Sequence, residues 1–170
     1  QDYMILQIIK DIGKSKPIYF AATVSELNQI GLQRYLSMEG MTYRLHFDEN
    51  ISRVNYKKMK QNLLEANNKN IIYTTDDYKN AIMSNQGLYR YTNLNDTTVF
   101  YSGNIQRLVQ NYRIGFIRLA QQELLLNKKE SKKNAEGFID LMNQYFPENQ
   151  LPIEPGIALL VTDSVYAKTG

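Results

Sequence analysis

The chain has 170 residues, of which 43% are hydrophobic and 22% charged, with a formal net charge of +3 and no cysteine. This is the composition of an ordinary globular domain, and the absence of cysteine excludes disulfide bonds and thiolate metal sites. No apolar run approaches the ~20 residues of a membrane-spanning helix, and the small, dispersed positive charge argues against a nucleic-acid-binding protein.

Hydrophobic periodicity predicts a helix and two strands in the first 50 residues. Isoleucines recur at helical spacing over 5–12, and Gly13 is placed to end that helix. Alternation of apolar and polar residues predicts strands at 18–24 and 41–47. Between them, 25–40 has the apolar stripe of a connecting helix. A helical crossover of this length fits a parallel β-α-β pair, which must pack on helices or on strands outside this sequence.

The middle of the chain has weaker patterns. A helix is expected over 53–66, and a second, short helix begins at Thr75 or Asp76. The segment 87–98 is expected to be irregular and to lead into a short extended piece at 99–101.

The last third of the chain has the clearest helical periodicity. Two helices are expected at 105–124 and 135–146, and a third begins near Ile157. The first two resemble a tetratricopeptide-repeat hairpin, and the residues that match its motif are Phe116, Leu119, Ala120, Ala135, Ile139 and Pro147. Met142 is too large for its position in that motif, and the turn is longer than usual. An ordinary helical hairpin is therefore the alternative.

Together these elements predict a mostly helical α+β fold. Residues 1–100 would form a mixed part, with a small two-stranded β-α-β-like unit packed on helices. Residues 101–170 would form the repeat-like helical hairpin, within the same compact unit.

No catalytic or metal-binding constellation is recognisable. His46 is the single histidine, and because a metal site needs several ligands we expect it to lie on the solvated face of its strand. The acidic pairs Asp48-Glu49 and Asp76-Asp77 stand where turn and helix-cap carboxylates are expected. The chain also lacks a nucleophile motif and a phosphate-binding glycine loop. We therefore expect no cofactor, no metal and no enzymatic activity of its own.

Tyrosine and asparagine gather between residues 73 and 101. Aromatic faces and amides suit the binding of a sugar or an extended peptide, although they also suit a packed irregular loop. The candidate ligand or partner surface consists of Tyr89, Arg90, Tyr91 and Tyr101.

Two short basic clusters form a second candidate surface. They consist of Lys57, Lys58 and Lys60, and of Lys128, Lys129, Lys132 and Lys133. Beside a membrane, anionic lipid would stabilise each such residue by ~1 kcal/mol. A solvated helix face and a charged turn are the simpler explanation, and Glu130 dilutes the second cluster.

Three motifs connect the chain with a known family. They are Lys-Pro-Ile-Tyr-Phe-Ala at 16–21, Tyr-Leu-x-x-Glu-Gly-x-x-Tyr-Arg-Leu at 35–45, and Asn-Tyr-Arg at 111–113 leading to Arg-Leu-Ala at 118–120. With them the chain resembles the C-terminal soluble part of large multi-pass bacterial membrane proteins, whose transmembrane half resembles protein O-mannosyltransferases. The likeness covers nearly the whole chain, loosely over 67–95. Because the sequence begins without Met, we expect it to be a piece of a longer protein.

This resemblance implies a membrane-embedded glycosyltransferase as the parent protein, using a lipid-linked sugar. Its catalytic acidic residue would lie in the transmembrane half, so none is carried over to this chain. The resemblance implies a non-catalytic accessory domain on the extracytoplasmic, periplasmic face of a bacterial membrane. Its partners would be an acceptor polypeptide, a partner protein or its own transmembrane half, and neither nucleic acid nor metal. The alternative is a stand-alone helical-repeat module for protein–protein interaction, unrelated to sugar transfer.

Overall fold

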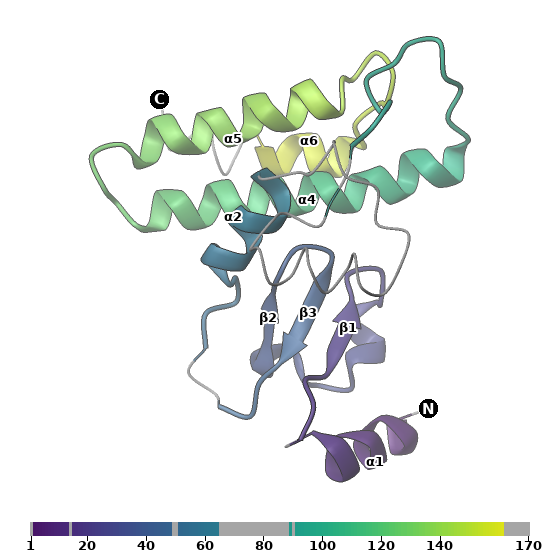
Figure 1. The fold of residues 1–170 in the computed structure, drawn as a ribbon, viewed down its shortest axis with the longest axis vertical. Helices are drawn as coiled ribbons and strands as arrows, with labels where there is room; N and C mark the ends of the chain where they lie inside the picture. Colours follow the sequence, from purple (N-terminus) through teal and green to yellow (C-terminus); the bar gives the residue numbers. More distant parts are fainter. Residues whose placement is uncertain (1, 14, 49–50, 65–88, 90, 162–170) are drawn as a thin grey trace, which may run out of the picture. The chain divides into compact units, whose positions relative to one another are not determined.

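The computed structural model describes residues 2–13, 15–48, 51–64, 89 and 91–161, and it divides the chain into two compact units, Gln1–Asn55 and Tyr56–Gly170 (Figure 1). The sequence had placed a boundary near residue 100 instead. The predicted short helix that begins at Thr75 or Asp76 lies outside the described residues. Nowhere in the described ranges does a helix have both the length and the apolar character that crossing a membrane requires.

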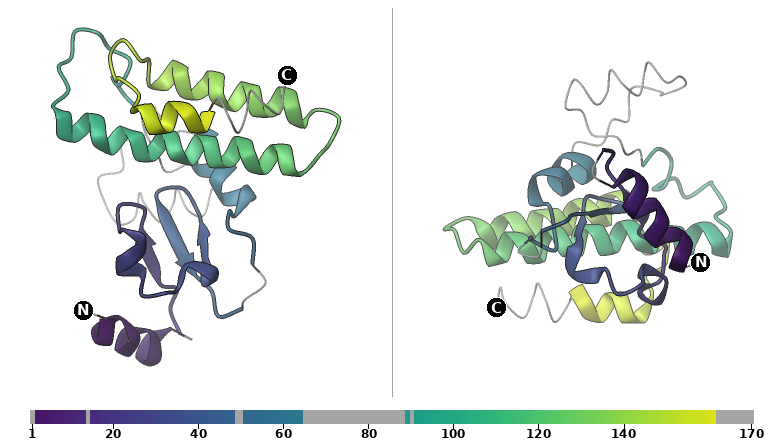
Figure 2. Two further views of the ribbon diagram at one scale, coloured as in Figure 1. Left: turned by 180° about the vertical axis from the view of Figure 1, so that it is seen from behind. Right: turned by 90° about the horizontal axis from the view of Figure 1, so that it is seen from below.

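The first unit is built on a three-stranded antiparallel sheet (Figures 1 and 2). Its strands are β1 (Tyr19–Ala21), β2 (Leu36–Met38) and β3 (Thr42–Leu45), in the order β1-β3-β2. The central position of β3 places Tyr43 opposite Phe20 on one side and opposite Met38 on the other.

The core of this unit consists of Phe20, Leu36 and Leu45. Helix α1 (Asp2–Ile12) packs against this core through Ile5 and Ile9, as its helical spacing predicts.

The prediction of a helical crossover over 25–40, between the two predicted strands, was wrong. The segment instead contains two short 3-10 helices, η1 (Glu26–Gln29) and η2 (Gln33–Tyr35), followed by β2. Ile30 and Gly31 have left-handed backbone angles, with φ of 46° and 77°, which interrupt any continuous helix. As a consequence, the expected pair of parallel strands is an antiparallel sheet of three.

Gly40 is the last residue of the segment 25–40, for which a connecting helix was predicted. Instead of ending a helix, it turns the chain between β2 and β3 with a φ of 103°, which favours glycine. The Glu39 N–H donates to the Thr42 carbonyl across this turn at 2.8 Å.

The second unit is helical in its described part. Helices α4 (Gly103–Leu125) and α5 (Ser131–Tyr145) form the predicted hairpin, and both α2 (Tyr56–Leu64) and α6 (Pro155–Val161) pack against α4 (Figure 1). Its fully buried side chains include Met59, Leu63, Phe116, Leu119, Ile139, Met142 and Phe146. The mostly helical α+β class is confirmed, whereas membership of the tetratricopeptide repeats stays a prediction.

Candidate ligand-binding groove

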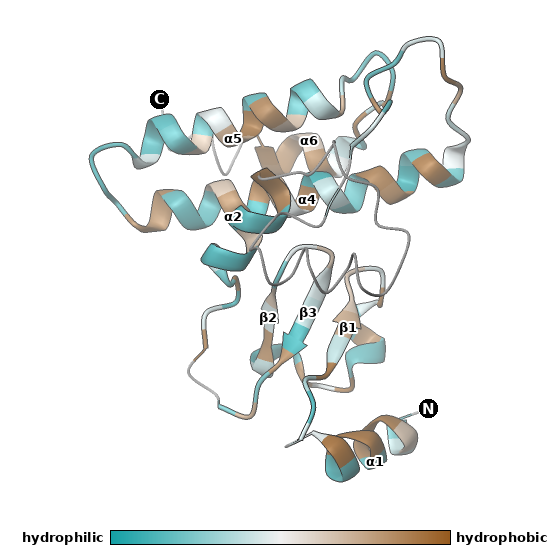
Figure 3. Ribbon diagram, in the orientation of Figure 1, coloured by the Kyte–Doolittle hydropathy of each residue, from teal (hydrophilic) through white to brown (hydrophobic). Residues whose placement is uncertain are grey.

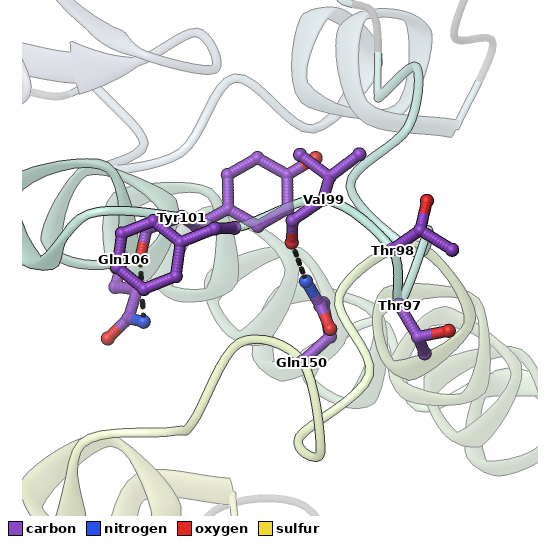
Figure 4. Close-up of a pocket in the computed structure, with 7 residues that line it drawn as sticks. Thr97, Thr98, Val99, Tyr101, Gln106 and Gln150 are labelled. Carbon is purple, nitrogen blue, oxygen red and sulfur yellow. Dashed lines mark hydrogen bonds between the residues drawn. The ribbon is translucent and has the colours of Figure 1, made fainter.

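A groove of about 280 Å³ opens where the chain approaches the start of α4 and passes the loop that follows α5 (Figure 4). It is lined by Thr97, Thr98, Val99, Phe100, Tyr101, Gln106 and Gln150. Its volume is close to the lower end of the ~300–1,000 Å³ range of small-molecule sites. This size suits a short segment of a chain-like ligand rather than a large cofactor.

Two glutamine amides hold the backbone of the groove in place. Gln106 Nε2 donates to the carbonyl of Tyr101 at 3.1 Å. Gln150 Nε2 donates to the carbonyl of Val99, so the loop after α5 is tied to the segment before α4 (Figure 4). The hydroxyl of Tyr101 donates to the carbonyl of Asn93 at 2.5 Å. The segment has no strand partner among the described residues, and these side chains replace the ladder that would order it.

Asp96 orders the beginning of the same segment. Its Oδ1 accepts the hydroxyl of Thr98 at 2.7 Å and the backbone N–H of Thr98 at 2.9 Å. These two hydrogen bonds lower the pKa of the Asp96 carboxyl. The carboxylate is therefore ionised at neutral pH and forms a local turn of the kind that Asp commonly makes.

The groove offers uncharged groups of two kinds. Phe100 is 89% exposed and presents an aromatic ring to solvent. The Oε1 atoms of Gln106 and Gln150 accept no hydrogen bond within the described ranges, and Thr97 is exposed. None of the seven lining residues is charged. An apolar platform beside neutral hydrogen-bonding groups suits a neutral polar chain, such as a polypeptide backbone or a glycan.

Of the predicted surface of Tyr89, Arg90, Tyr91 and Tyr101, one described residue, Tyr101, lines this groove. Tyr91, by contrast, is 3% exposed and belongs to the core. The Tyr91 ring lies 4.5 Å from that of Tyr145 and 5.5 Å from that of Tyr112 between centroids. Burial raises the pKa of Tyr91 far above that of a free tyrosine. Tyr89 packs edge-on against Tyr112, and Arg90 lies outside the described residues.

Sequence reasoning missed Phe100, Gln106 and Gln150. Phe100 lies in the predicted extended piece at 99–101. Its position just before a long helix was the one feature of the sequence that could have indicated a binding role. Gln150 is far along the chain from the segment that it binds, and no spacing rule connects the two. Only the packing of the loop after α5 brings it there.

The other candidate residues lie on separate surfaces. The seven lysines of the two basic clusters are all exposed, the first three on α2 and the other four around the turn into α5. Lys60 places its ammonium 5.9 Å from the centre of the Tyr56 ring. No group of three or more His, Cys, Asp or Glu side chains in the described ranges is arranged to hold a metal ion.

His46 differs from the expected solvated residue. It is half-buried, and its Nε2 is enclosed without a hydrogen-bond partner in the described structure. Its backbone N–H donates to the carbonyl of Tyr35 at 2.8 Å, which holds the end of β3 against the chain before β2.

Comparison with known proteins concerns the first unit. Residues 1–55 match the family model described as TMEM260-associated domain 2. No curated protein and no solved structure matches the chain. The matched residues end at Asn55, which is also where the first compact unit ends, so the family match and the first unit cover the same residues of this chain.

Proposed function

We propose that this chain is a non-catalytic accessory domain of a membrane-embedded glycosyltransferase, and that it binds an acceptor polypeptide on the extracytoplasmic side. The match of residues 1–55 supports the kind of parent protein, because TMEM260 is a multi-pass membrane protein related to O-mannosyltransferases. The groove beside α4 supports the binding role. Catalysis would belong to the transmembrane half of the parent, as the sequence resemblance implies.

The uncharged groove with its exposed ring is the observation that carries this proposal. An extended polypeptide presents alternating N–H and C=O groups along its length. Gln106 and Gln150 would accept its N–H groups through their Oε1 atoms, which accept no hydrogen bond within the described ranges. Phe100 would pack against one of its side chains, and full burial of such a ring is worth roughly 1.5–3 kcal/mol.

The same chemistry argues against the sugar donor as the ligand. A lipid-linked donor carries phosphate, and proteins recognise phosphate with arginine, lysine or several converging backbone N–H groups. The groove has no cationic side chain, and the ionised carboxylate of Asp96 lies in the chain just before it. An anionic ligand would therefore be repelled.

Binding of the whole chain to an array of short, uncharged, Ser/Thr-rich peptides tests this proposal, with fluorescence anisotropy as the readout. Phe100→Ala is expected to weaken binding about tenfold, which corresponds to ~1.4 kcal/mol. Its matched control is Tyr3→Ala on α1, since Tyr3 is also an aromatic residue and is 80% exposed.

Two results would contradict the proposal. One is peptide binding that Phe100→Ala leaves unchanged. The other is binding of neutral oligosaccharides, but not of any peptide, by the unaltered protein, which would make the groove a glycan site instead of an acceptor site.

A further inference from the structure

The turn between α4 and α5 brings exposed leucines and lysines together. We name residues 125–133 the hairpin tip (Figure 1). Leu125 is 69% exposed and Leu126 is 37% exposed. Beside them the tip carries four exposed lysines and one acidic residue, Glu130, and Figure 3 shows a hydrophilic stretch in the connection between the helices. The lysines are Lys128, Lys129, Lys132 and Lys133.

The fold makes no use of these four charges. None of the four lysines forms an ion pair within the described part of the chain. Lys132 and Lys133 lie in the first turn of α5, which contains no acidic residue. The partial charge of a helix N-terminus is positive, so lysines there are unfavourable. Glu130, at the N-cap of α5, offsets only part of this charge. The excess positive charge of the tip would be favourable beside an external anionic surface.

The tip is also ordered in advance. The backbone N–H groups of Leu126 and Asn127 donate to carbonyls of the last turn of α4 at 3.1 and 3.2 Å. The backbone N–H of Lys128 donates to the Ser131 hydroxyl at 3.0 Å, which closes the turn. Docking would therefore need little further ordering of the backbone, and this ordering is one of the main costs of association.

We propose that the hairpin tip docks on an anionic lipid surface, with Leu125 and Leu126 entering the interface and the lysines contacting lipid phosphates. Apolar side chains flanked by basic residues are typical of segments that lie in the bilayer interface. A nucleic acid would match the lysines but leave the two leucines exposed. The observations therefore favour lipid over a polyanion in solution.

This inference is independent of the groove. Gln106 stands near the start of α4 and Leu125 at its end, which separates them by about 28 Å along the helix axis at 1.5 Å per residue. A tip docked on a membrane would hold the groove at a fixed distance along α4 from the lipid.

Co-sedimentation of the whole chain with vesicles tests the inference. We expect binding to vesicles of phosphatidylglycerol and phosphatidylcholine that falls as salt increases, with little binding to phosphatidylcholine alone. The double variant Leu125→Ser with Leu126→Ser should reduce the bound fraction several-fold, and so should Lys128→Glu with Lys129→Glu. These side chains are exposed, so circular dichroism should show an unchanged fold.

Matched controls distinguish binding through the hairpin tip from nonspecific binding through other exposed apolar residues. Leu159→Ser with Leu160→Ser removes two exposed leucines from α6 and should leave vesicle binding unchanged. Phe100→Ala should also leave it unchanged, so that failure of the groove proposal and failure of this one are distinguishable. Absence of binding to anionic vesicles would overturn the inference, as would binding that depends on the lysines but not on Leu125 and Leu126.

Discussion

Arg113 joins the middle of α4 to the loop between α5 and α6 from a fully buried position. One of its guanidinium nitrogens, Nη2, donates to the carbonyls of Phe146 at 2.7 Å and Leu151 at 2.5 Å. Phe146 follows the last residue of α5, where the helix dipole favours a positive charge. Burial lowers the pKa of Arg113 and Glu148 raises it, and the guanidinium remains charged at neutral pH.

A substitution of Arg113 compares two opposing contributions to stability, the desolvation cost of the guanidinium and its hydrogen bonds to two carbonyls. Nε and Nη1 of Arg113 are buried without a hydrogen-bond partner in the described structure, so the side chain also carries a desolvation cost. Arg113→Met removes that cost but leaves two buried carbonyls unpaired. We expect the free energy of unfolding to fall by about 2 kcal/mol, because hydrogen bonds to charged groups dominate. Urea unfolding measures this, and an unchanged or raised stability would show that desolvation is the larger effect.

Glu123 connects three helices through one carboxylate. It is buried on α4 and accepts the Tyr56 hydroxyl of α2 and, at 2.9 Å, the Asn134 amide of α5. Burial alone would raise the pKa of Glu123, but hydrogen bonds from Tyr56, Asn134 and Ser131 lower it below the ordinary value of 4.5. Burial and the same hydrogen bond raise the pKa of Tyr56, which therefore stays protonated.

The pH dependence of stability follows from the lowered pKa of Glu123. A carboxyl with a lowered folded-state pKa stabilises the fold above its ordinary pKa, and this contribution is lost as the pH falls through the folded-state value. Glu123→Gln should therefore be less stable than the unaltered chain at neutral pH, and the difference should shrink below pH 4.5. Urea unfolding at a series of pH values measures it. A difference that stayed constant with pH would contradict this role for the carboxylate.

At the scale of elements, Gly115 lies where α4 packs closely against α2, and Gly137 on α5 is a matched glycine in open space. A Cβ added to Gly115 on α4 would lie 3.4 Å from Cδ1 of Leu63 on α2, whereas a Cβ at Gly137 on α5 would meet nothing within 4 Å. Gly115→Leu should lower the free energy of unfolding by about 1–3 kcal/mol through overpacking. Gly137→Leu should raise it by about 0.5 kcal/mol, because leucine favours helix. Thermal unfolding compares them, and equal effects would contradict the close packing.

The elements that the sequence predicted well are those whose signal is local. Helices α4 and α5 keep an apolar period over several turns, and their predicted and observed ends agree within a few residues. Strand β2 was missed because the spacing of Leu32, Tyr35 and Leu36 fits a helix as well. The turn at Gly40 sets the pairing of β2 with β3. The spacing of apolar residues gives no information about that turn.

The candidate groove was predictable only in part for the same reason. The sequence singled out Tyr101 within a region rich in aromatic residues and amides. It could not separate Tyr101, which lines the groove, from Tyr91, which packs in the core, because burial depends on α4 and α5. The contribution of Gln150 depends on a tertiary hydrogen bond that no local pattern encodes.

At the scale of the whole molecule, the chain divides into a first unit that matches a family model and a second, helical unit. Residues 1–55 match TMEM260-associated domain 2, and the groove and the hairpin tip both belong to the second unit, Tyr56–Gly170. The family match therefore lies in the first unit, whereas both candidate binding surfaces lie in the second. Recognition of the first unit alone would therefore not locate the proposed acceptor site.

Two-dimensional NMR of the whole chain, titrated with an uncharged Ser/Thr-rich peptide, tests the proposed acceptor site most directly. We expect the largest shifts at the backbone amides of residues 97–101 and at the side-chain amides of Gln106 and Gln150, while residues 125–133 remain unchanged. Shifts concentrated in the hairpin tip or in α1, or none at a saturating peptide concentration, would contradict it.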